Sequence, residues 1–243
     1  MNLSKHPRFL ARVGGAFYVA IVVSAMFGYR YVRGQLIMPG DMHHTMNNLV
    51  MHEQLFRIGF SAAVVTVLCN LPMGAILYEL LKLRSPRLAL LALLFIMIST
   101  AIEAANVLNY MSPLFTITLP EYRAAFTPIQ LQALVRGANR LWGYGFSVSL
   151  AFFGVACVLN GYLILRSKFL PRILGALMIV GGAYNLTDSF GTFLGLPDIP
   201  YIGLLHVTLV AESALALWLL AFGVNEAQWR EQAEALRVSM RTS

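Results

Sequence analysis

The stretch LALLALLFIMISTAIEAANVLNY, residues 88–110, contains a single charged side chain, that of Glu103. A helix needs about 20 apolar residues to cross the hydrocarbon core of a bilayer, so this stretch predicts a transmembrane helix. A charged side chain at the bilayer centre costs about 2.5–3.5 kcal/mol on insertion scales. Glu103 is therefore expected to face the protein interior or a water-filled cavity, and it is the first candidate for a functional residue.

The whole chain has this membrane character. It has 243 residues, of which 58% are hydrophobic and 12% charged, with a mean hydropathy of +0.68. A soluble domain averages about 25% charged residues. We therefore expect an all-α polytopic membrane protein made of one domain, residues 1–243, with a polar tail from about residue 225. Six stretches are long enough to span: Phe9–Val32, Leu55–Leu81, Leu88–Tyr110, Gly143–Leu165, Ile173–Leu194 and Tyr201–Val224.

The distribution of Lys and Arg predicts the orientation. One predicted side carries twelve of these residues: Lys5, Arg8, Arg12, Lys82, Arg84, Arg87, Arg166, Lys168, Arg172, Arg230, Arg237 and Arg241. The other side carries six: Arg30, Arg33, Arg57, Arg123, Arg136 and Arg140. This bias places both termini in the cytoplasm and accounts for the net charge of +7. It does not indicate nucleic-acid binding, because no soluble basic face is predicted.

Three Pro-Arg pairs suggest an internal repeat. Pro7-Arg8, Pro86-Arg87 and Pro171-Arg172 each begin a predicted helix, where a proline is well tolerated. This spacing suggests three repeated helical hairpins. The residues sixteen positions after each arginine are Ser24, Glu103 and Asp188. The alternative is that multi-pass helices share basic starts and a small alphabet of residues.

Two further carboxylates lie in apolar stretches. Asp188 and Glu103 are expected in the outer half of the membrane, and Glu212 near its middle. The groups expected to line a polar pocket with them, open to the outside, are Asn106, Asn185, His206, Arg57 and Arg140. The alternative is a set of ion pairs, such as Glu103 with Arg140, that only hold helices together.

The first outer loop is enriched in possible metal ligands. Met42 and Met46 place their thioether sulfurs on one face of a predicted helix, and His43, His44 and His52 lie nearby in the sequence. Thioether and imidazole together suit Cu(I). A short interfacial helix with Asp41 as its N-cap is expected here, and it should continue into the second span. The alternative to copper is that the Met side of this helix faces lipid and its His side faces water. A zinc hydrolase built from His206, Glu212, Glu103 and Asp188 is a further possibility, although no His-Glu-x-x-His motif occurs.

The sequence also resembles a known family. The matching motifs are Pro39-Gly40-Asp41, Leu55-Phe56-Arg57, Gly161-Tyr162-Leu163, the run Phe169-Leu170-Pro171-Arg172-Ile173-Leu174-Gly175, and Glu212 with Trp218-Leu219-Leu220. These are similar to the bacterial multi-pass membrane family known as domain of unknown function 4386. The resemblance implies a multi-helix protein of a bacterial inner membrane and implies no activity. The Met- and His-rich loop does not follow the family pattern.

Three classes of function follow from these observations. The leading hypothesis is a membrane protein that binds or moves a small ligand, an ion or a proton at the outward-facing pocket. The second is a membrane-embedded enzyme acting on a lipid-soluble substrate, with His206 or His52 and a carboxylate as acid–base pair, and with copper or zinc as the possible cofactor. The third is an accessory subunit whose carboxylates only join helices.

Overall fold

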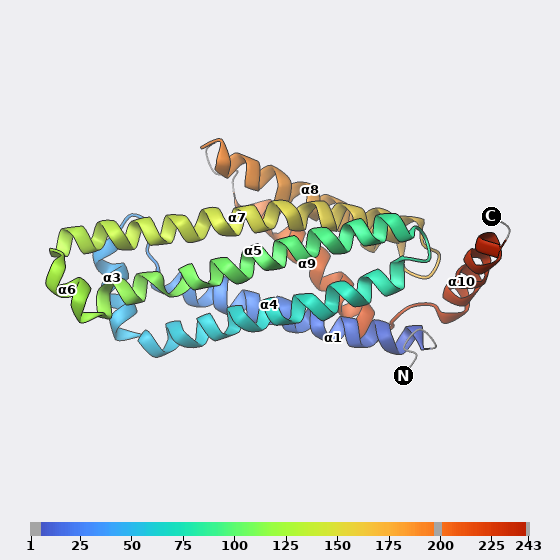
Figure 1. The fold of residues 1–243 in the computed structure, drawn as a ribbon, viewed down its shortest axis with the longest axis horizontal. Helices are drawn as coiled ribbons and strands as arrows, with labels where there is room; N and C mark the ends of the chain where they lie inside the picture. The colour runs from blue at the N-terminus through green and yellow to red at the C-terminus, as the bar shows by residue number, and fades with distance from the viewer. Residues whose placement is uncertain (1–5, 197–200, 242–243) are drawn as a thin grey trace.

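The computed structural model describes residues 6–196 and 201–241, with side chains for residues 6–196 and 208–236, and the secondary structure of this part of the chain is helical. The elements are α1 (Pro7–Ala25), the π-helix η2 (Met26–Val32), α2 (Arg33–Leu36), α3 (Met42–Met51), α4 (Glu53–Leu81), α5 (Pro86–Thr118), α6 (Pro120–Ala125), α7 (Pro128–Arg166), α8 (Arg172–Phe193), α9 (Tyr201–Ala221) and α10 (Glu226–Arg241). The elongated bundle that they form is shown in Figure 1.

The predicted polytopic architecture is confirmed. Five segments are long and apolar enough to cross a membrane: Pro7–Leu36, Glu53–Leu81, Pro86–Thr118, Pro128–Arg166 and Arg172–Phe193. A sixth span is counted if α9, described here from Thr208, and α10 are taken together as one bent span. These two helices meet at an angle of 96°. The structure therefore holds five to six long apolar helices, against the six predicted.

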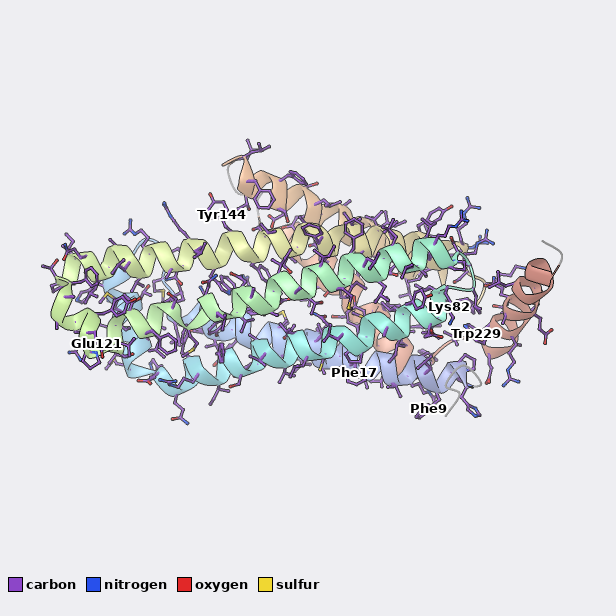
Figure 2. All side chains as sticks on the ribbon, viewed as in Figure 1. Phe9, Phe17, Lys82, Glu121, Tyr144 and Trp229 are labelled. Carbon is purple, nitrogen blue, oxygen red and sulfur yellow. The ribbon has the colours of Figure 1, made fainter. Side chains whose placement is uncertain are left out.

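The long helices form a closed ring. Each packs against the next one along the chain, in the order α1, α4, α5, α7, α8 and α9, and α9 returns to pack against α1. The N-terminus and α10 lie at one end of the bundle, here called the terminal end, and α3 and α6 lie at the opposite, distal end (Figure 1). Figure 2 places Lys82 and Trp229 at the terminal end and Glu121 at the distal end.

Two helices are longer than the membrane spans predicted from the sequence. The predicted spans ended at Tyr110 and began at Gly143, whereas α5 runs on to Thr118 and α7 begins at Pro128. At 1.5 Å per residue, α7 is about 58 Å long and α5 about 50 Å, well beyond a hydrocarbon core of about 30 Å. Their distal parts are helical because a second apolar core holds them, which includes Val32, Leu36, Leu49, Phe56, Tyr110, Leu114 and Val135.

The short helix before the second span forms as predicted, with one difference. The Asp41 side chain accepts a hydrogen bond from the His44 backbone N–H and caps α3. The helix does not run straight into the span, because His52 has φ −121° and ψ 35°, outside the helical region. Its N–H bonds to the Asn48 carbonyl, and its own carbonyl accepts from Phe56 N–H, so one helix ends where the next begins.

Candidate functional site

The π-helix η2 interrupts the first span near its distal end. Such segments are rare, and they occur often at functional sites because they change the direction of side chains within a helix. Here η2 carries Tyr29 and leads directly to Arg33, and both side chains turn toward α5 and α7. These two residues are the centre of the candidate site.

Glu103 is buried on α5, with 8% of its surface exposed. The Tyr29 hydroxyl donates a hydrogen bond to Glu103 Oε1 at 2.8 Å. None of the arginine and lysine side chains that the structure describes forms an ion pair with Glu103. The pairing with Arg140, which was the alternative to a polar pocket, is absent from the described contacts, and the carboxyl group is held by a neutral donor.

Arg33 is a buried cation, with 6% of its surface exposed. Its guanidinium lies 3.8 Å from the centre of the Trp142 ring and 5.0 Å from that of Tyr110, which are cation–π distances. Its Nη2 donates to Asn139 Oδ1 at 2.8 Å. Arg33 Nη1 and Asn139 Nδ2 are both buried and bond no acceptor among the described residues. Two adjacent side chains therefore offer donors to an acceptor group.

Aromatic rings separate these two charged groups. The Tyr29 ring packs against Trp142 at 5.8 Å between centroids and edge-on against Phe146 at 5.3 Å. Trp142 and Phe146 are stacked with each other at 5.3 Å. Tyr29 thus contacts Glu103 through its hydroxyl and Trp142 through its ring. The cluster of Tyr29, Arg33, Glu103, Asn139, Trp142 and Phe146 is called the aromatic–charged cluster below.

Backbone contacts fix the cluster in place. The Tyr110 hydroxyl donates to the Gly28 carbonyl in η2 at 3.0 Å, and Asn106 Nδ2 donates to the Trp142 carbonyl at 2.9 Å. A side chain at Gly28 would place its Cβ 2.7 Å from the Gly59 carbonyl oxygen. Glycine at this crossing lets η2 approach α4 closely, which brings Tyr29 and Arg33 toward α5 and α7.

The depth of the cluster can be counted from the terminal end. Glu103 lies sixteen residues beyond Arg87, about 24 Å along the helix axis. Trp142 lies twenty-four residues from Arg166, about 36 Å along α7. With a hydrocarbon core of about 30 Å, Glu103 lies inside the membrane and Trp142 and Arg33 lie at its distal boundary. The cluster therefore extends from that boundary toward the interior.

Glu212 belongs to a second polar group, on the α8–α9 side of the ring. It is partly buried on α9, in the neighbourhood of Tyr18 of α1, Cys157 of α7 and Glu103. One turn earlier, Thr208 Oγ1 donates to Asn185 Oδ1 of α8 at 3.3 Å. Asn185 is buried, and its Nδ2 bonds no partner among the described residues. Glu212 is thus a carboxyl group on the α8–α9 side of the ring that is close enough to Glu103 for their charges to interact.

The structure places the other predicted site residues in different surroundings. Asn106 lies beside the cluster, on α5, and Asp188 is partly buried on α8, where it has interaction partners. Arg57 is about half exposed and forms an ion pair with Glu53 at 2.7 Å. Arg140 is exposed on α7. The His206 side chain lies outside the described residues.

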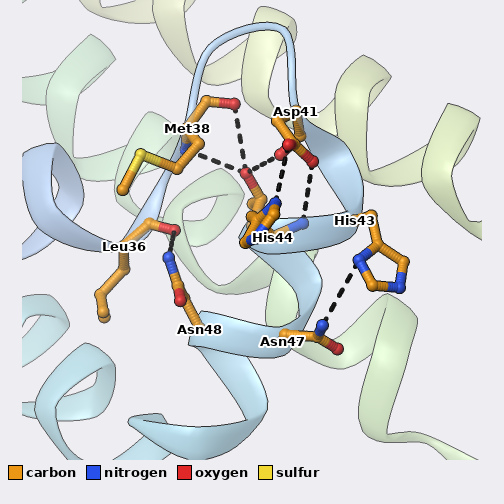
Figure 3. A network of polar contacts seen from close by, with 8 residues as sticks. Leu36, Met38, Asp41, His43, His44, Asn47 and Asn48 are labelled. Carbon is orange, nitrogen blue, oxygen red and sulfur yellow. Dashed lines mark hydrogen bonds and ion pairs between the residues drawn. The ribbon is translucent and has the colours of Figure 1, made fainter.

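The predicted metal ligands of the first loop lie on different faces of α3. Met42 is buried in the distal core with Met46 packed against that core, whereas His43, His44 and His52 are exposed. Figure 3 shows that the His44 ring contacts Asp41, at 2.7 Å, and that His43 contacts Asn47, at 3.4 Å. Within the described residues, no three His, Cys, Asp or Glu side chains are placed to hold a metal ion.

Sequence reasoning missed the cation of the cluster. Arg33 was counted among six surface charges of the outer side, because it follows the apolar part of the first span. Two spacings carry a signal. Tyr29 and Arg33 are four residues apart, and Asn139 and Trp142 are three apart, so each pair shares one helical face. Nothing in the sequence indicates that these two faces meet.

The fold and the cluster define a polytopic membrane protein with buried charged groups. Comparison with known families gives one match, to the domain of unknown function DUF4386, over residues 13–223. The chain belongs to this family, as the motifs in its sequence suggested. No curated protein and no solved structure matches the chain significantly.

Proposed function

We propose that this protein binds, and moves, a small ligand that carries an anionic or carbonyl group, together with a proton or cation, at the aromatic–charged cluster. One observation carries the proposal. Arg33 and Glu103 are buried groups of opposite charge, and neither forms an ion pair with a described residue. They are joined through two packed rings, because Glu103 bonds Tyr29, Tyr29 packs against Trp142, and Trp142 covers Arg33. Ionisable groups within a membrane are functional candidates by default, because their burial costs free energy and they often mark the path of a ligand, ion or proton.

Each charged group has a distinct role in this proposal. Arg33 Nη1 and Asn139 Nδ2 donate to the ligand's acceptor group, and the Trp142 ring covers the guanidinium. Glu103 holds the proton or cation, and Tyr29 fixes its carboxyl group. Glu212, close enough to Glu103 for their charges to interact, is a second carboxyl group for the proton or cation. Arg33 takes the counter-charge role predicted for Arg57 or Arg140.

The test uses short carboxylates as probes. Purified protein in mild detergent is titrated with acetate through octanoate, and with the matching alkyl amines, while the melting temperature and the tryptophan emission are recorded. We expect the carboxylates to raise the melting temperature of the wild type. Arg33→Gln should weaken this binding about tenfold or more, because a hydrogen bond to a charged group contributes about 1.5–3 kcal/mol.

Matched controls come from the exposed helix α6. Arg123→Gln and Glu121→Gln make the same chemical changes as Arg33→Gln and Glu103→Gln outside the cluster, and should leave binding unchanged. Glu103→Gln should remove the pH dependence of binding. The proposal is wrong if Arg33→Gln, Glu103→Gln and Glu212→Gln all bind the probes as the wild type does. A wild type that binds no probe and has a bare mass in native mass spectrometry supports the accessory-subunit hypothesis.

A further inference from the structure

A groove at the terminal end lies outside the aromatic–charged cluster. It has a volume of about 540 Å³ and runs between the start of α1, the α7–α8 loop, the end of α9 and the start of α10. Its lining combines two cations, Arg8 and Lys168, with two aromatic side chains, Trp218 and Phe222. A smaller adjoining hollow of about 240 Å³ shares Arg8 and adds Arg12.

The backbone builds this groove. Gly223, with φ +70°, ends α9, and its N–H and that of Phe222 both bond to the Trp218 carbonyl. Asn225 N–H then donates to the Phe169 carbonyl at 3.1 Å, which ties the α9–α10 turn to the α7–α8 loop. Arg8 Nε donates to the Phe222 carbonyl at 3.2 Å, so α1 closes the third side.

The helix that follows turns along the expected membrane surface. α10 meets α9 at 96°, so a span perpendicular to the bilayer leaves α10 parallel to it. Its Trp229 side chain is buried, with 7% of its surface exposed. Amphipathic helices with this placement lie at the boundary between headgroups and acyl chains. The groove therefore lies at the depth of the phospholipid headgroups.

The charge of the groove favours a phosphate. Arg8 and Lys168 are exposed, and no described carboxylate forms an ion pair with either. The one carboxylate of the lining, Glu226, is engaged by Arg230 at 2.6 Å. Next to these cations, Phe222 is 58% exposed and its ring packs on Trp218 at 4.6 Å between centroids. Aromatic rings beside cations suit a headgroup and its first acyl carbons together.

We propose that this groove binds the headgroup of an anionic phospholipid, with Arg8 and Lys168 on the phosphate and Trp218 and Phe222 against the acyl chains. The proposal is independent of the function assigned to the aromatic–charged cluster. The surrounding basic residues of the terminal end, among them Arg12 and Arg172, add to the attraction of an anionic leaflet.

The experiment measures lipid binding to the whole chain by native mass spectrometry. Purified, delipidated protein is titrated with phosphatidylglycerol and, separately, with phosphatidylcholine. We expect phosphatidylglycerol to bind more tightly, and Lys168→Gln and Arg8→Gln each to weaken it about fivefold, as expected for one basic residue near an anionic headgroup. Arg84→Gln, an exposed cation of the same end outside the groove lining, should change it less than twofold.

Two further variants separate the alternatives. Because Arg8 also bonds the end of α9, Lys168→Gln decides the result if Arg8→Gln fails to fold. Trp218→Leu should weaken lipid binding without changing the response to inorganic phosphate. The proposal is overturned if Lys168→Gln binds phosphatidylglycerol as Arg84→Gln does, or if both lipids bind equally. It is also overturned if inorganic phosphate displaces the lipid and Trp218→Leu has no effect, which would indicate a site for free phosphate.

Discussion

Arg33 and Asp41 are eight residues apart and illustrate opposite environments for a charged side chain. Arg33 is buried beneath Trp142, where aromatic faces replace water around the guanidinium. Asp41 lies in the loop after the first span, exposed to solvent, and caps α3. A charge within the membrane depends on its protein neighbours, whereas a charge outside it responds directly to solution conditions.

Asp41 therefore gives a pH-dependent local stability. The His44 backbone N–H, and then the His44 side chain, lower the pKa of the Asp41 carboxyl group below its ordinary value. Because the pKa is lower in the folded state, the carboxylate stabilises α3 above the ordinary pKa of about 3.9. That contribution is lost as the pH falls through the lowered value.

Hydrogen exchange of residues 42–51 between pH 7 and pH 3 tests this prediction. In the wild type, protection of the first turn should decrease over the acidic part of the range, relative to Asp41→Asn. The asparagine variant still caps the helix but has no carboxyl group at this position, so its protection should not show the acidic decrease that Asp41 causes. Equal pH profiles in the two proteins would show that the Asp41 charge does not stabilise α3.

At the scale of single residues, the sequence identified the acids better than the bases. Glu103 stood out because it lies alone in a long apolar run, and the structure buries it. Arg33 did not, because it lies at a helix end where surface arginines are common. Its burial depends on contacts with α7, more than a hundred residues away in the chain. Local pattern carries no information on such a contact.

Pairs of helices meet along seams of small residues with regular spacing. Between α7 and α8, Gly154 faces Gly182 and Gly161 faces Gly175, and the Cβ of a residue in place of Gly161 would lie 2.6 Å from the Gly175 carbonyl oxygen. The two pairs are seven residues apart on each helix, which is the spacing of antiparallel helices that cross at a shallow angle. Small residues let backbones approach within a membrane, where burial of apolar surface contributes little to helix association.

The α7–α8 seam gives a test at this scale. Gly161→Leu should destabilise the protein by about 1–3 kcal/mol, because the added side chain forces the two backbones apart. Unfolding in mixed micelles with increasing sodium dodecyl sulfate measures the effect. Gly137→Ala is the control on the same helix, since nothing lies within 4 Å of its Cβ position, and it should be neutral or slightly stabilising. If Gly161→Leu unfolds as Gly137→Ala does, the seam does not hold the helices together.

A second seam joins α5 and α7 with hydrogen bonds. The Ser99 and Ser149 hydroxyls each donate to the other residue's carbonyl, at 2.9 and 3.0 Å. Seven residues further along each helix, Asn106 donates to the Trp142 carbonyl. The same register that joins the serines thus places Trp142 beside Glu103's helix. The hairpins predicted from the Pro-Arg spacing are adjacent helix pairs here, although the internal repeat itself stays a prediction.

At the scale of the whole molecule, the terminal end and the distal end differ in how well the sequence predicted them. The helix starts at Pro7, Pro86 and Arg172 and the Asp41 cap were readable from sequence, since each has a local signature. The lengths of α5 and α7 were not, because the hydropathy signal stops where the lipid stops, while a protein core continues to support the helix.

The charge bias predicts the orientation of the protein in the membrane, and this prediction can be tested directly. In a background with Cys69→Ser and Cys157→Ser, single cysteines are introduced by Glu121→Cys and by Ser243→Cys. In intact bacterial cells, a membrane-impermeant maleimide should label the first variant and should reach the second only after lysis. The reverse labelling pattern would invert the predicted orientation. Labelling of both variants in intact cells would contradict the placement of Glu121 and the C-terminus on opposite sides.

The length of α5 and α7 has a practical consequence for imaging. A membrane protein of 26.9 kDa is hidden almost wholly in a detergent micelle, so its single-particle images have little contrast to align. Here the distal parts of two packed helices, α5 and α7, stand beyond the hydrocarbon by a distance of about 20–28 Å, at 1.5 Å per residue. An antibody fragment raised against this rigid hairpin would serve as a fiducial mark. Images aligned on this hairpin and its bound antibody fragment would then resolve the transmembrane helices as well.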